Sequence, residues 1–217
     1  IWPDFIEGHH HKIIAEKFER VARGELKRLI INMAPRHTKS EFASFLFPAW
    51  MMGRVPRMKI IQATHTTELA VNFGRKVKNL IEADEYREVF PEVKLAVDSK
   101  ASGRWDKNKG GMYYAVGVGS NLAGRGGDLV IIDDPHSEQT SMSANGFEDA
   151  WDWYTGGPRQ RLQPGGSIVL VQTRWSEKDM TGQLLRSMAK DPLADQWEVV
   201  ELPAIFESGE PCWPEYW

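Results

Sequence analysis

The stretch RLIINMAPRHTKSEFASFLFPAW, residues 28–50, decides the fold of this chain. Its apolar, partly β-branched start leads into the loop APRHTKS (34–40), and a second apolar-rich segment follows. Strand, tight loop, Lys-Ser and helix in this order are the layout of a phosphate-binding loop. However, Met33 and Thr38 stand where the pattern G-x-x-x-x-G-K-[ST] has glycine. The stretch therefore predicts either a phosphate loop without its glycines or a chance Lys-Ser after a strand.

The composition is that of an ordinary soluble globular protein. Hydrophobic residues make up 41% and charged residues 26% of 217 residues, which suits one α/β domain. No apolar run approaches the ~20 residues of a membrane span, and residues 1–20 are too polar for a signal peptide, so we expect no membrane partner. The single cysteine, Cys212, excludes an internal disulfide and fits a reducing compartment. The net charge of -3 argues against a static grip on DNA over one broad basic face, so any DNA contact should be local, transient or shared among several copies.

Apolar runs alternate with segments of helical spacing along the chain. The predicted strands are residues 26–33, 57–65, 112–119, 128–134, 166–175 and 197–205. The predicted helices are residues 9–24, 39–52, 66–83, 147–154 and 177–190, the fourth of them flanked by loops. Several strands are apolar on both faces. The pattern therefore predicts an α/β fold with a mostly parallel central sheet flanked by helices.

The first candidate site is the Lys-Ser pair of the loop. Open parallel sheets bind ligands at the carboxyl ends of their strands, which is where Lys39 and Ser40 are expected. Backbone N–H groups and the helix dipole favour phosphate oxygens there. Lys39 would reach the β- and γ-phosphates of ATP, and the Ser40 hydroxyl would ligate Mg²⁺. The alternative is a solvated lysine at a helix start beside a serine N-cap.

The second candidate site is the pair of carboxylates that ends the run DLVIIDD (128–134). A P-loop ATPase needs one carboxylate to hold the Mg²⁺ shell and another to orient or deprotonate the attacking water. Asp133 suits the first role and Asp134 the second. Alone, such a pair is also typical of a turn or a helix cap. Together with the Lys-Ser loop upstream, it favours nucleotide hydrolysis.

Four segments of the chain resemble, in order, the large terminase subunits that package DNA in tailed phages. APRHTKSE (34–41) resembles their phosphate loop PPRHGKSE, and LAGRGGDLVIIDDPH (122–136) is similar to the segment with their second motif. VQTRWSEKDMTGQLL (171–185) is similar to their coupling motif, and HHHKIIAEKFERVARGELKRLIINM (9–33) to their lead-in. Thr38 departs from the family, which usually has glycine there. Because a β-branched residue resists positive φ, we expect the loop to be right-handed at Thr38 or strained.

The resemblance implies a P-loop NTPase fold of the ASCE type and a Mg²⁺-dependent ATPase that drives double-stranded viral DNA into a procapsid. Residues 1–217 would be the ATPase (motor) domain, with residues 1–25 as a helical lead-in and residues 176–217 as a C-terminal lid or linker part. The nuclease domain of the family would be absent from this chain. The implied partners are double-stranded DNA, the portal of the procapsid, the small terminase subunit and further copies of the chain in a ring. The implied location is the cytoplasm of the infected bacterial host.

The resemblance also assigns roles to arginines. The guanidinium of Arg36 would fork onto the γ-phosphate, and Arg125, in a glycine-rich loop, is a candidate arginine finger for a neighbouring subunit. The alternatives are a salt bridge for Arg36 and ordinary solvation for Arg125, with Arg104 as a rival finger. The ATP-binding residues implied by the loop are Pro35, Arg36, His37, Thr38, Lys39 and Ser40.

Two further segments carry candidate residues. Gln172 or Thr173, at the end of a strand expected beside that of Asp133, would sense the γ-phosphate and pass its loss to the following helix. The alternative is a strand end that satisfies its own caps. Arg159 and Arg161, in GGPRQRLQPGG (156–166), are candidates for DNA-backbone contact, as is RWDKNKGG at residues 104–111. Solvated charge is the alternative for both.

Two other function classes fit the same motifs. A P-loop helicase or repair-type ATPase would share the chemistry of Lys39 and Asp133. A nucleic-acid adaptor that does not hydrolyse ATP would explain a degenerate loop. The histidines at 9–11 lack acidic or cysteine partners at ligand spacing, so no zinc is expected.

Overall fold

The computed structural model describes residues 2–99 and 101–216, and within them the strands form one sheet. Its seven strands lie in the order β3-β4-β2-β5-β6-β1-β7, and all neighbours are parallel except β3 and β4. The strands are β1 (Arg28–Met33), β2 (Lys59–Thr64), β3 (Arg104–Asp106), β4 (Met112–Gly117), β5 (Gly127–Asp133), β6 (Leu162–Gln172) and β7 (Glu198–Leu202). The prediction of a mostly parallel central sheet is confirmed.

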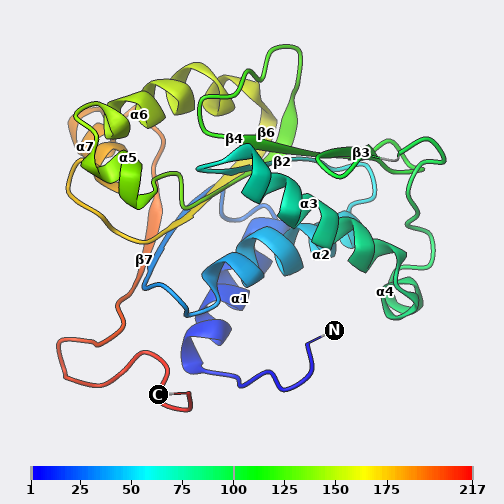
Figure 1. The fold of residues 1–217 in the computed structure, drawn as a ribbon, viewed down its shortest axis with the longest axis horizontal. Coiled ribbons are helices and arrows are strands. Elements are labelled where there is room, and N and C mark those ends of the chain that lie inside the picture. The colour runs from blue at the N-terminus through cyan, green and yellow to red at the C-terminus, as the bar shows by residue number, and fades with distance from the viewer. Residues whose placement is uncertain (1, 100, 217) are drawn as a thin grey trace.

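Helices cover both faces of this sheet (Figure 1). On one side lie α1, the π-helical turn η1, α2 and α3, and on the other lie α5, α6 and α7 (Figure 1). The bounds are α1 (His9–Ala22), η1 (Glu41–Leu46), α2 (Phe47–Arg54), α3 (Thr67–Glu82), α4 (Asp84–Val89), α5 (Glu138–Met142), α6 (Gly146–Gly156), η2 (Pro158–Arg161) and α7 (Met180–Lys190). No helix of the described part of the chain is both long and apolar enough to cross a membrane.

The strands are apolar on both faces because each face packs against helices. In β1, Leu29 and Ile31 join the core beneath α1, α2 and α3, whereas Ile30 joins the core beneath α6 and α7. The same alternation divides β5, where Leu129 faces the first core and Val130 the second. Such two-sided burial is the mark of a parallel sheet.

The strand order brings the carboxyl ends of three strands together. β6 lies between β5 and β1, with Asp133 beside Val171 and Asn32 beside Gln172. The loop strand β1 is thus separated from the carboxylate strand β5 by one strand, β6. The loop after β1, the carboxylates after β5 and the end of β6 therefore share one edge of the sheet.

Several elements differ from the sequence prediction. The helix expected at 39–52 begins with the π-helical turn η1, and β6 begins at Leu162, before the predicted start. The basic segment at 104–111 carries solvated charge over only part of its length, because Arg104, Asn108 and Lys109 are exposed but other residues are buried. It contains the edge strand β3, and Trp105 and Lys107 are only 1% and 3% exposed. The Trp105 ring stacks on Tyr113 at 4.9 Å, and the Nζ of buried Lys107 donates to the Met52 carbonyl at 2.7 Å.

Candidate functional site

The loop between β1 and η1 has an unusual backbone. Arg36 and Thr38 have positive φ angles of 62° and 69°, and Asp134, on the same edge of the sheet, has φ 42°. Left-handed backbone at a non-glycine residue costs on the order of 1–3 kcal/mol and persists only where the surroundings impose it. Of the two outcomes expected for Thr38, the structure has the strained one. Backbone strain gathers at this edge of the sheet.

Asp133, the last residue of β5, is buried, with only 2% of its surface exposed. The Ser40 hydroxyl donates to Asp133 Oδ1 at 3.1 Å, and the Ser44 hydroxyl donates to Oδ2 at 2.6 Å. Gln62 on β2 donates from Nε2 to the Ser44 hydroxyl oxygen at 2.8 Å. Burial, and secondarily the charge of Asp134, raises the pKa of Asp133 to about 7. Hydroxyl donors thus hold both oxygens of a deeply buried carboxyl group.

Asp134, one residue further, faces the loop lysine. Lys39 Nζ lies 2.8 Å from Asp134 Oδ2, and the Thr173 backbone N–H donates to Asp134 Oδ1 at 2.7 Å. The Asp134 N–H in turn donates to the Val171 carbonyl at 2.9 Å. Lys39 is only 7% exposed, so the carboxylate balances a nearly buried ammonium charge. The two carboxylates expected to act together do lie together, one toward Ser40 and the other toward Lys39.

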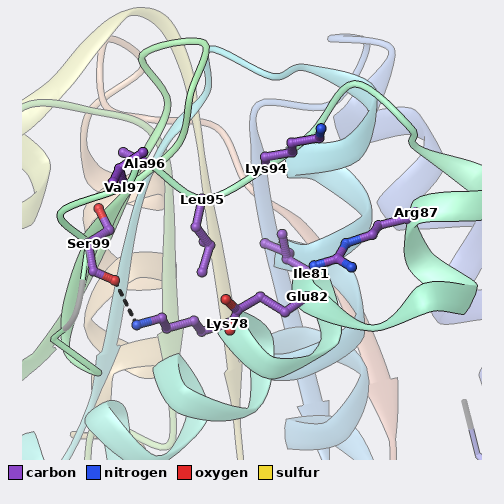
Figure 2. Close-up of a pocket in the computed structure, with 9 residues that line it drawn as sticks. All are labelled: Lys78, Ile81, Glu82, Arg87, Lys94, Leu95, Ala96, Val97 and Ser99. Atoms are coloured by element: carbon purple, nitrogen blue, oxygen red, sulfur yellow. Dashed lines mark hydrogen bonds between the residues drawn. The ribbon is translucent and has the colours of Figure 1, made fainter.

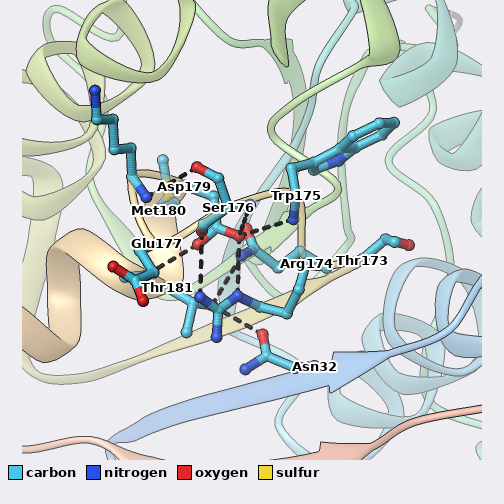
Figure 3. A network of polar contacts seen from close by, with 12 residues as sticks. Asn32, Thr173, Arg174, Trp175, Ser176, Glu177, Asp179, Met180 and Thr181 are labelled. Atoms are coloured by element: carbon cyan, nitrogen blue, oxygen red, sulfur yellow. Dashed lines mark hydrogen bonds and ion pairs between the residues drawn. The ribbon is translucent and has the colours of Figure 1, made fainter.

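The end of β6 connects this pair to the second layer of helices. Thr173 contacts Asp134, whereas Gln172 donates to the Thr181 hydroxyl oxygen on α7 at 2.9 Å. Thr181 donates to Asn32 Oδ1 at 2.8 Å (Figure 3). Asn32 in turn donates to Glu201 Oε1 at 2.7 Å. A chain of side-chain hydrogen bonds therefore runs from β6 through α7 and β1 to β7.

Asp179 fixes the start of α7 against the end of β6. It accepts hydrogen bonds from the N–H groups of Gly182 and Trp175 and pairs with Arg174 Nε at 2.9 Å (Figure 3). Burial alone would raise the pKa of Asp179, but these donors outweigh it and hold the pKa below its usual value. The segment predicted to couple the site to a helix is thus bonded directly to that helix.

The sequence analysis gave no role to four of these buried polar residues, namely Asn32, Ser44, Gln62 and Thr181. Ser44 had a usable signal, because it follows Ser40 by four residues and so shares its helix face. Gln62 and Asn32 are polar residues within otherwise apolar strands, which is a weaker signal of the same kind.

The remaining candidate residues lie elsewhere. Arg36 is exposed on the loop itself. Arg125 precedes β5, so the length of that strand, about 20 Å, separates it from Asp133. Its guanidinium carbon lies 3.8 Å above the centre of the Tyr114 ring. Arg159 and Arg161 precede β6 at the same distant edge, and Arg159 Nε pairs with Asp195 at 2.5 Å. The structure therefore brings Arg36 to the site and keeps these other three arginines at the opposite edge.

Two cavities help to delimit the site. One of about 690 Å³ lies between the end of α3 and the segment at 94–99, where Lys78 Nζ donates to the Ser99 carbonyl at 2.7 Å (Figure 2). Its other charged lining residues are Glu82, Arg87 and Lys94, and it contains none of the paired groups above. A smaller cavity of about 280 Å³ opens beside Pro35 and Thr173. The smaller cavity is the better candidate for the functional site, because it adjoins the loop and Thr173, whereas the larger one contains none of the paired groups.

The structure thus has an α/β fold whose mostly parallel sheet is flanked by helices, with the Lys39 loop and the two carboxylates together at one edge of the sheet. Among the solved structures that the chain resembles is the large terminase of bacteriophage HK97. The TM-score is 0.64 at 13% sequence identity, and the match covers 95% of this chain and 41% of that chain. The large terminase of a thermophilic bacteriophage has a TM-score of 0.57 at 12% identity, covering 94% of this chain and 49% of that one.

A further structure of the thermophilic phage's large terminase, in complex with ATP-gamma-S, matches with a TM-score of 0.50 at 12% identity. It covers 89% of this chain and 45% of that chain. This chain thus spans less than half the length of each of these terminase chains. No protein-family model and no curated protein matches the sequence. At identities this low, the structural likeness establishes the fold.

Proposed function

We propose that this chain is the ATPase domain of a phage DNA-packaging motor, in which ATP hydrolysis drives double-stranded DNA into a procapsid. One observation carries the proposal: Ser40 of the loop contacts Asp133, the last residue of β5, and Lys39 contacts Asp134, the residue after it. This is the pairing that nucleotide hydrolysis requires of a phosphate loop and its metal carboxylate. The terminase fold supports the choice of a packaging motor among P-loop ATPases.

The nucleotide would lie over residues 35–40. The loop N–H groups and the Lys39 ammonium would bind the phosphates, and the exposed Arg36 would approach the γ-phosphate. The fold is shared with a thermophilic-phage terminase solved with ATP-gamma-S, which supports a nucleoside triphosphate as the ligand. ATP is therefore the proposed substrate.

The residues present fit Mg²⁺. Ser40 offers a hydroxyl and Asp133 a carboxylate 3.1 Å away, which are the hard oxygen donors that Mg²⁺ prefers. The raised pKa of Asp133 reflects a buried charge without a full positive partner, and a bound cation would supply that partner. When bound, Mg²⁺ would neutralise charge on the β- and γ-phosphates. Ser44 and Gln62 would keep the Asp133 carboxylate oriented toward Ser40.

Asp134 would serve as the general base. The phosphates of a bound triphosphate would compete for Lys39, which now pairs with Asp134. The released carboxylate would then accept a proton from the water that attacks the γ-phosphate. Asp134 also accepts the Thr173 N–H, so a change in its charge partner would be felt at the end of β6 and, through Gln172 and Thr181, on α7. We propose this path as the coupling route.

The larger assembly is proposed on the same basis. Residues 1–25 would act as the lead-in and residues 176–217 as the lid or linker part, although α7 and the sheet strand β7 lie in the latter interval. Residues 1 and 217, which bound the proposed ATPase domain, lie outside the described residues. The proposed partners are double-stranded DNA, the portal, the small subunit and further copies of the chain in a ring, within the host cytoplasm. Arg125 would act in trans in that ring, and Arg159 and Arg161 would contact DNA.

The test is ATP turnover against subunit concentration, with and without duplex DNA. A packaging ATPase should hydrolyse ATP in a Mg²⁺-dependent manner, respond to duplex DNA and show no strand separation on forked DNA. Strand separation would instead identify a helicase. Tight DNA binding without any turnover would identify a non-hydrolysing adaptor.

A further inference from the structure

A histidine from the N-terminal helix contacts the strained residue of the phosphate loop. His11 Nε2 lies 2.8 Å from Thr38 Oγ1, although the two residues are 27 positions apart. We propose that His11 is a positioning residue that holds Thr38, and with it the phosphate loop, in the left-handed conformation. The inference deepens the proposed function and rests on it for its effect on nucleotide.

Thr38 needs an external hold. Its φ of 69° is one that a β-branched residue adopts only at a cost, whereas glycine adopts it freely. The Thr38 hydroxyl donates to the His37 carbonyl at 2.5 Å and is left with lone pairs that can accept one more hydrogen bond. His11 Nε2 is placed to supply that bond. The Thr38 side chain therefore has two effects: its β-branch makes the left-handed conformation costly, and its hydroxyl accepts the hydrogen bond that holds that conformation.

The second nitrogen of His11 determines which proton is available. The Gly8 backbone N–H donates to His11 Nδ1 at 2.8 Å, so Nδ1 is unprotonated and the neutral ring carries its proton on Nε2. Nε2 is then a donor toward Thr38. Each of the three donors, the Gly8 N–H, the His11 Nε2–H and the Thr38 hydroxyl, thus has an acceptor. The Gly8 N–H, at the start of α1, therefore fixes the His11 tautomer that can donate to Thr38.

The ring is also held in place by packing. His11 is 3% exposed, stacks on Phe42 at 4.9 Å with an interplanar angle of 16°, and meets the edge of Trp213 at 5.0 Å. Phe42 belongs to the helical turn that follows the loop, and Trp213 to the C-terminal segment. Burial lowers the pKa of His11 to about 4, so the neutral ring is the form present near neutral pH. His11 therefore connects α1, the loop, the following turn and the C-terminal segment.

Packing alone and the proposed hydrogen bond make different predictions. The matched variants are His11→Asn and His11→Gln. An asparagine oxygen can accept from Gly8 but its side chain is too short for Thr38, whereas a glutamine amide places an N–H close to the position of Nε2. Thr38→Gly removes both the strain and the hydroxyl. A packing role would make the effect of His11 substitution independent of residue 38.

The first experiment measures the contact without nucleotide. The ¹⁵N shifts of the His11 ring should show a proton on Nε2 and none on Nδ1, and Thr38→Val should shift the Nε2 signal. Urea unfolding of His11→Asn, Thr38→Gly and the double variant should give non-additive changes, because the two residues share one interaction. An Nδ1-protonated ring, or additive changes, would overturn the contact.

The second experiment measures positioning through ATP-gamma-S affinity in the presence of Mg²⁺. His11→Asn should weaken binding about tenfold, the usual scale for one lost buried hydrogen bond, and His11→Gln should stay within about threefold of wild type. In the Thr38→Gly background, His11→Asn should have little effect. Equal losses in both backgrounds, or a Gln variant as weak as the Asn variant, would overturn the positioning role.

A wild-type protein that binds no ATP-gamma-S would overturn the proposed function and the positioning role with it. The ring tautomer and the unfolding cycle would still decide whether His11 holds Thr38. The two failures are therefore distinguishable.

Discussion

Lys39 Nζ and Asp134 Oδ2 lie 2.8 Å apart, and this ion pair joins the loop after β1 to the residue that follows β5. The intervening strand β6 reaches the same point, because the Thr173 N–H donates to the other oxygen of Asp134. One carboxylate is thus in contact with the proposed phosphate-binding lysine and with the proposed coupling segment. Changes at Asp134 should separate binding from hydrolysis.

Asp134→Asn should preserve ATP binding and stop hydrolysis. The amide still accepts the Thr173 N–H but cannot take a proton from water, so turnover should fall by about 10²-fold or more. Asp133→Asn, the matched change one residue earlier, should instead weaken Mg²⁺ binding. Nucleotide titration and steady-state turnover measure the two effects. An Asp134→Asn protein with the wild-type rate would show that the base lies elsewhere.

Thr38→Gly should leave ATP affinity unchanged or improve it. Glycine removes the strain of a left-handed β-branched residue, on the order of 1–3 kcal/mol, and loses the two hydrogen bonds of the Thr38 hydroxyl, each worth about 0.5–1.5 kcal/mol. The gain and the loss are therefore of similar size. The measurement is ATP affinity by titration. A tenfold loss, about 1.4 kcal/mol, would show that the Thr38 side chain itself contacts the nucleotide.

Ser44→Ala should weaken Mg²⁺ affinity by about tenfold. The hydroxyl does not reach the metal in the proposed arrangement, but it holds Asp133 Oδ2 at 2.6 Å, and loss of such a supporting donor commonly costs 10–100-fold. Ser143→Ala, at the exposed serine that follows α5, is the control. Turnover against Mg²⁺ concentration gives the result. Equal curves for both variants would remove Ser44 from the site.

Much of this site could be predicted because its motifs end buried parallel strands. Lys39, Ser40, Asp133 and Asp134 each follow an apolar run, and parallel strands place their carboxyl ends on one edge. The strand pairing of β5 with β6 then brings Thr173 to Asp134. The order of elements along the chain was enough to predict this grouping.

Other features depend on contacts that no local pattern contains. The three residues of β3 are too few to show a period, and Trp105 is buried by a stack with Tyr113 across an antiparallel pair. The contact of His11 with Thr38 depends on how α1 packs over the loop. Likewise, the sequence predicted either solvation or DNA contact for Arg159. In the structure, Arg159 pairs with Asp195, 36 positions away.

Lys107 should make the stability of the fold depend on pH. Burial lowers its pKa from 10.5 to about 7, and its Nζ donates to the Met52 carbonyl. Between these pKa values the unfolded chain binds a proton that the folded protein lacks. The free energy of unfolding should therefore rise with pH across this window, and this gain in stability should be lost as pH falls toward 7.

Urea unfolding at several values from about pH 7.5 to 9.5 measures this slope, which should approach 1.4 kcal/mol per pH unit. Lys107→Met keeps the apolar stem and should remove this contribution, whereas Lys109→Met, at an exposed neighbour, should not. Burial raises the pKa of Cys212, which acts in the opposite direction but equally in all three proteins, so it cancels in the differences. Identical slopes in wild type and Lys107→Met would contradict the assignment.

Full activity should require a neighbouring subunit that supplies Arg125. Within one chain, the length of β5 separates Arg125 from Asp133, so this arginine can serve only the site of another copy. Head-to-tail contacts in a ring juxtapose unlike edges of successive subunits, as such a transfer requires.

Release of Arg125 from its stack on Tyr114 would place a finger that accelerates phosphoryl transfer by roughly 10³–10⁵ in other systems. Turnover per subunit should therefore rise with protein concentration. Arg125→Ala should abolish the rise while sparing ATP binding, and Arg104→Ala, at the rival exposed arginine on β3, should retain it. The decisive measurement mixes Arg125→Ala with Asp134→Asn protein, each nearly inactive alone. Mixed rings should recover hydrolysis, because an intact Arg125 from one subunit then faces an intact Asp134 in the next. If no activity returns at concentrations where the two variants demonstrably associate, Arg125 has no role in trans and its stack on Tyr114 is structural.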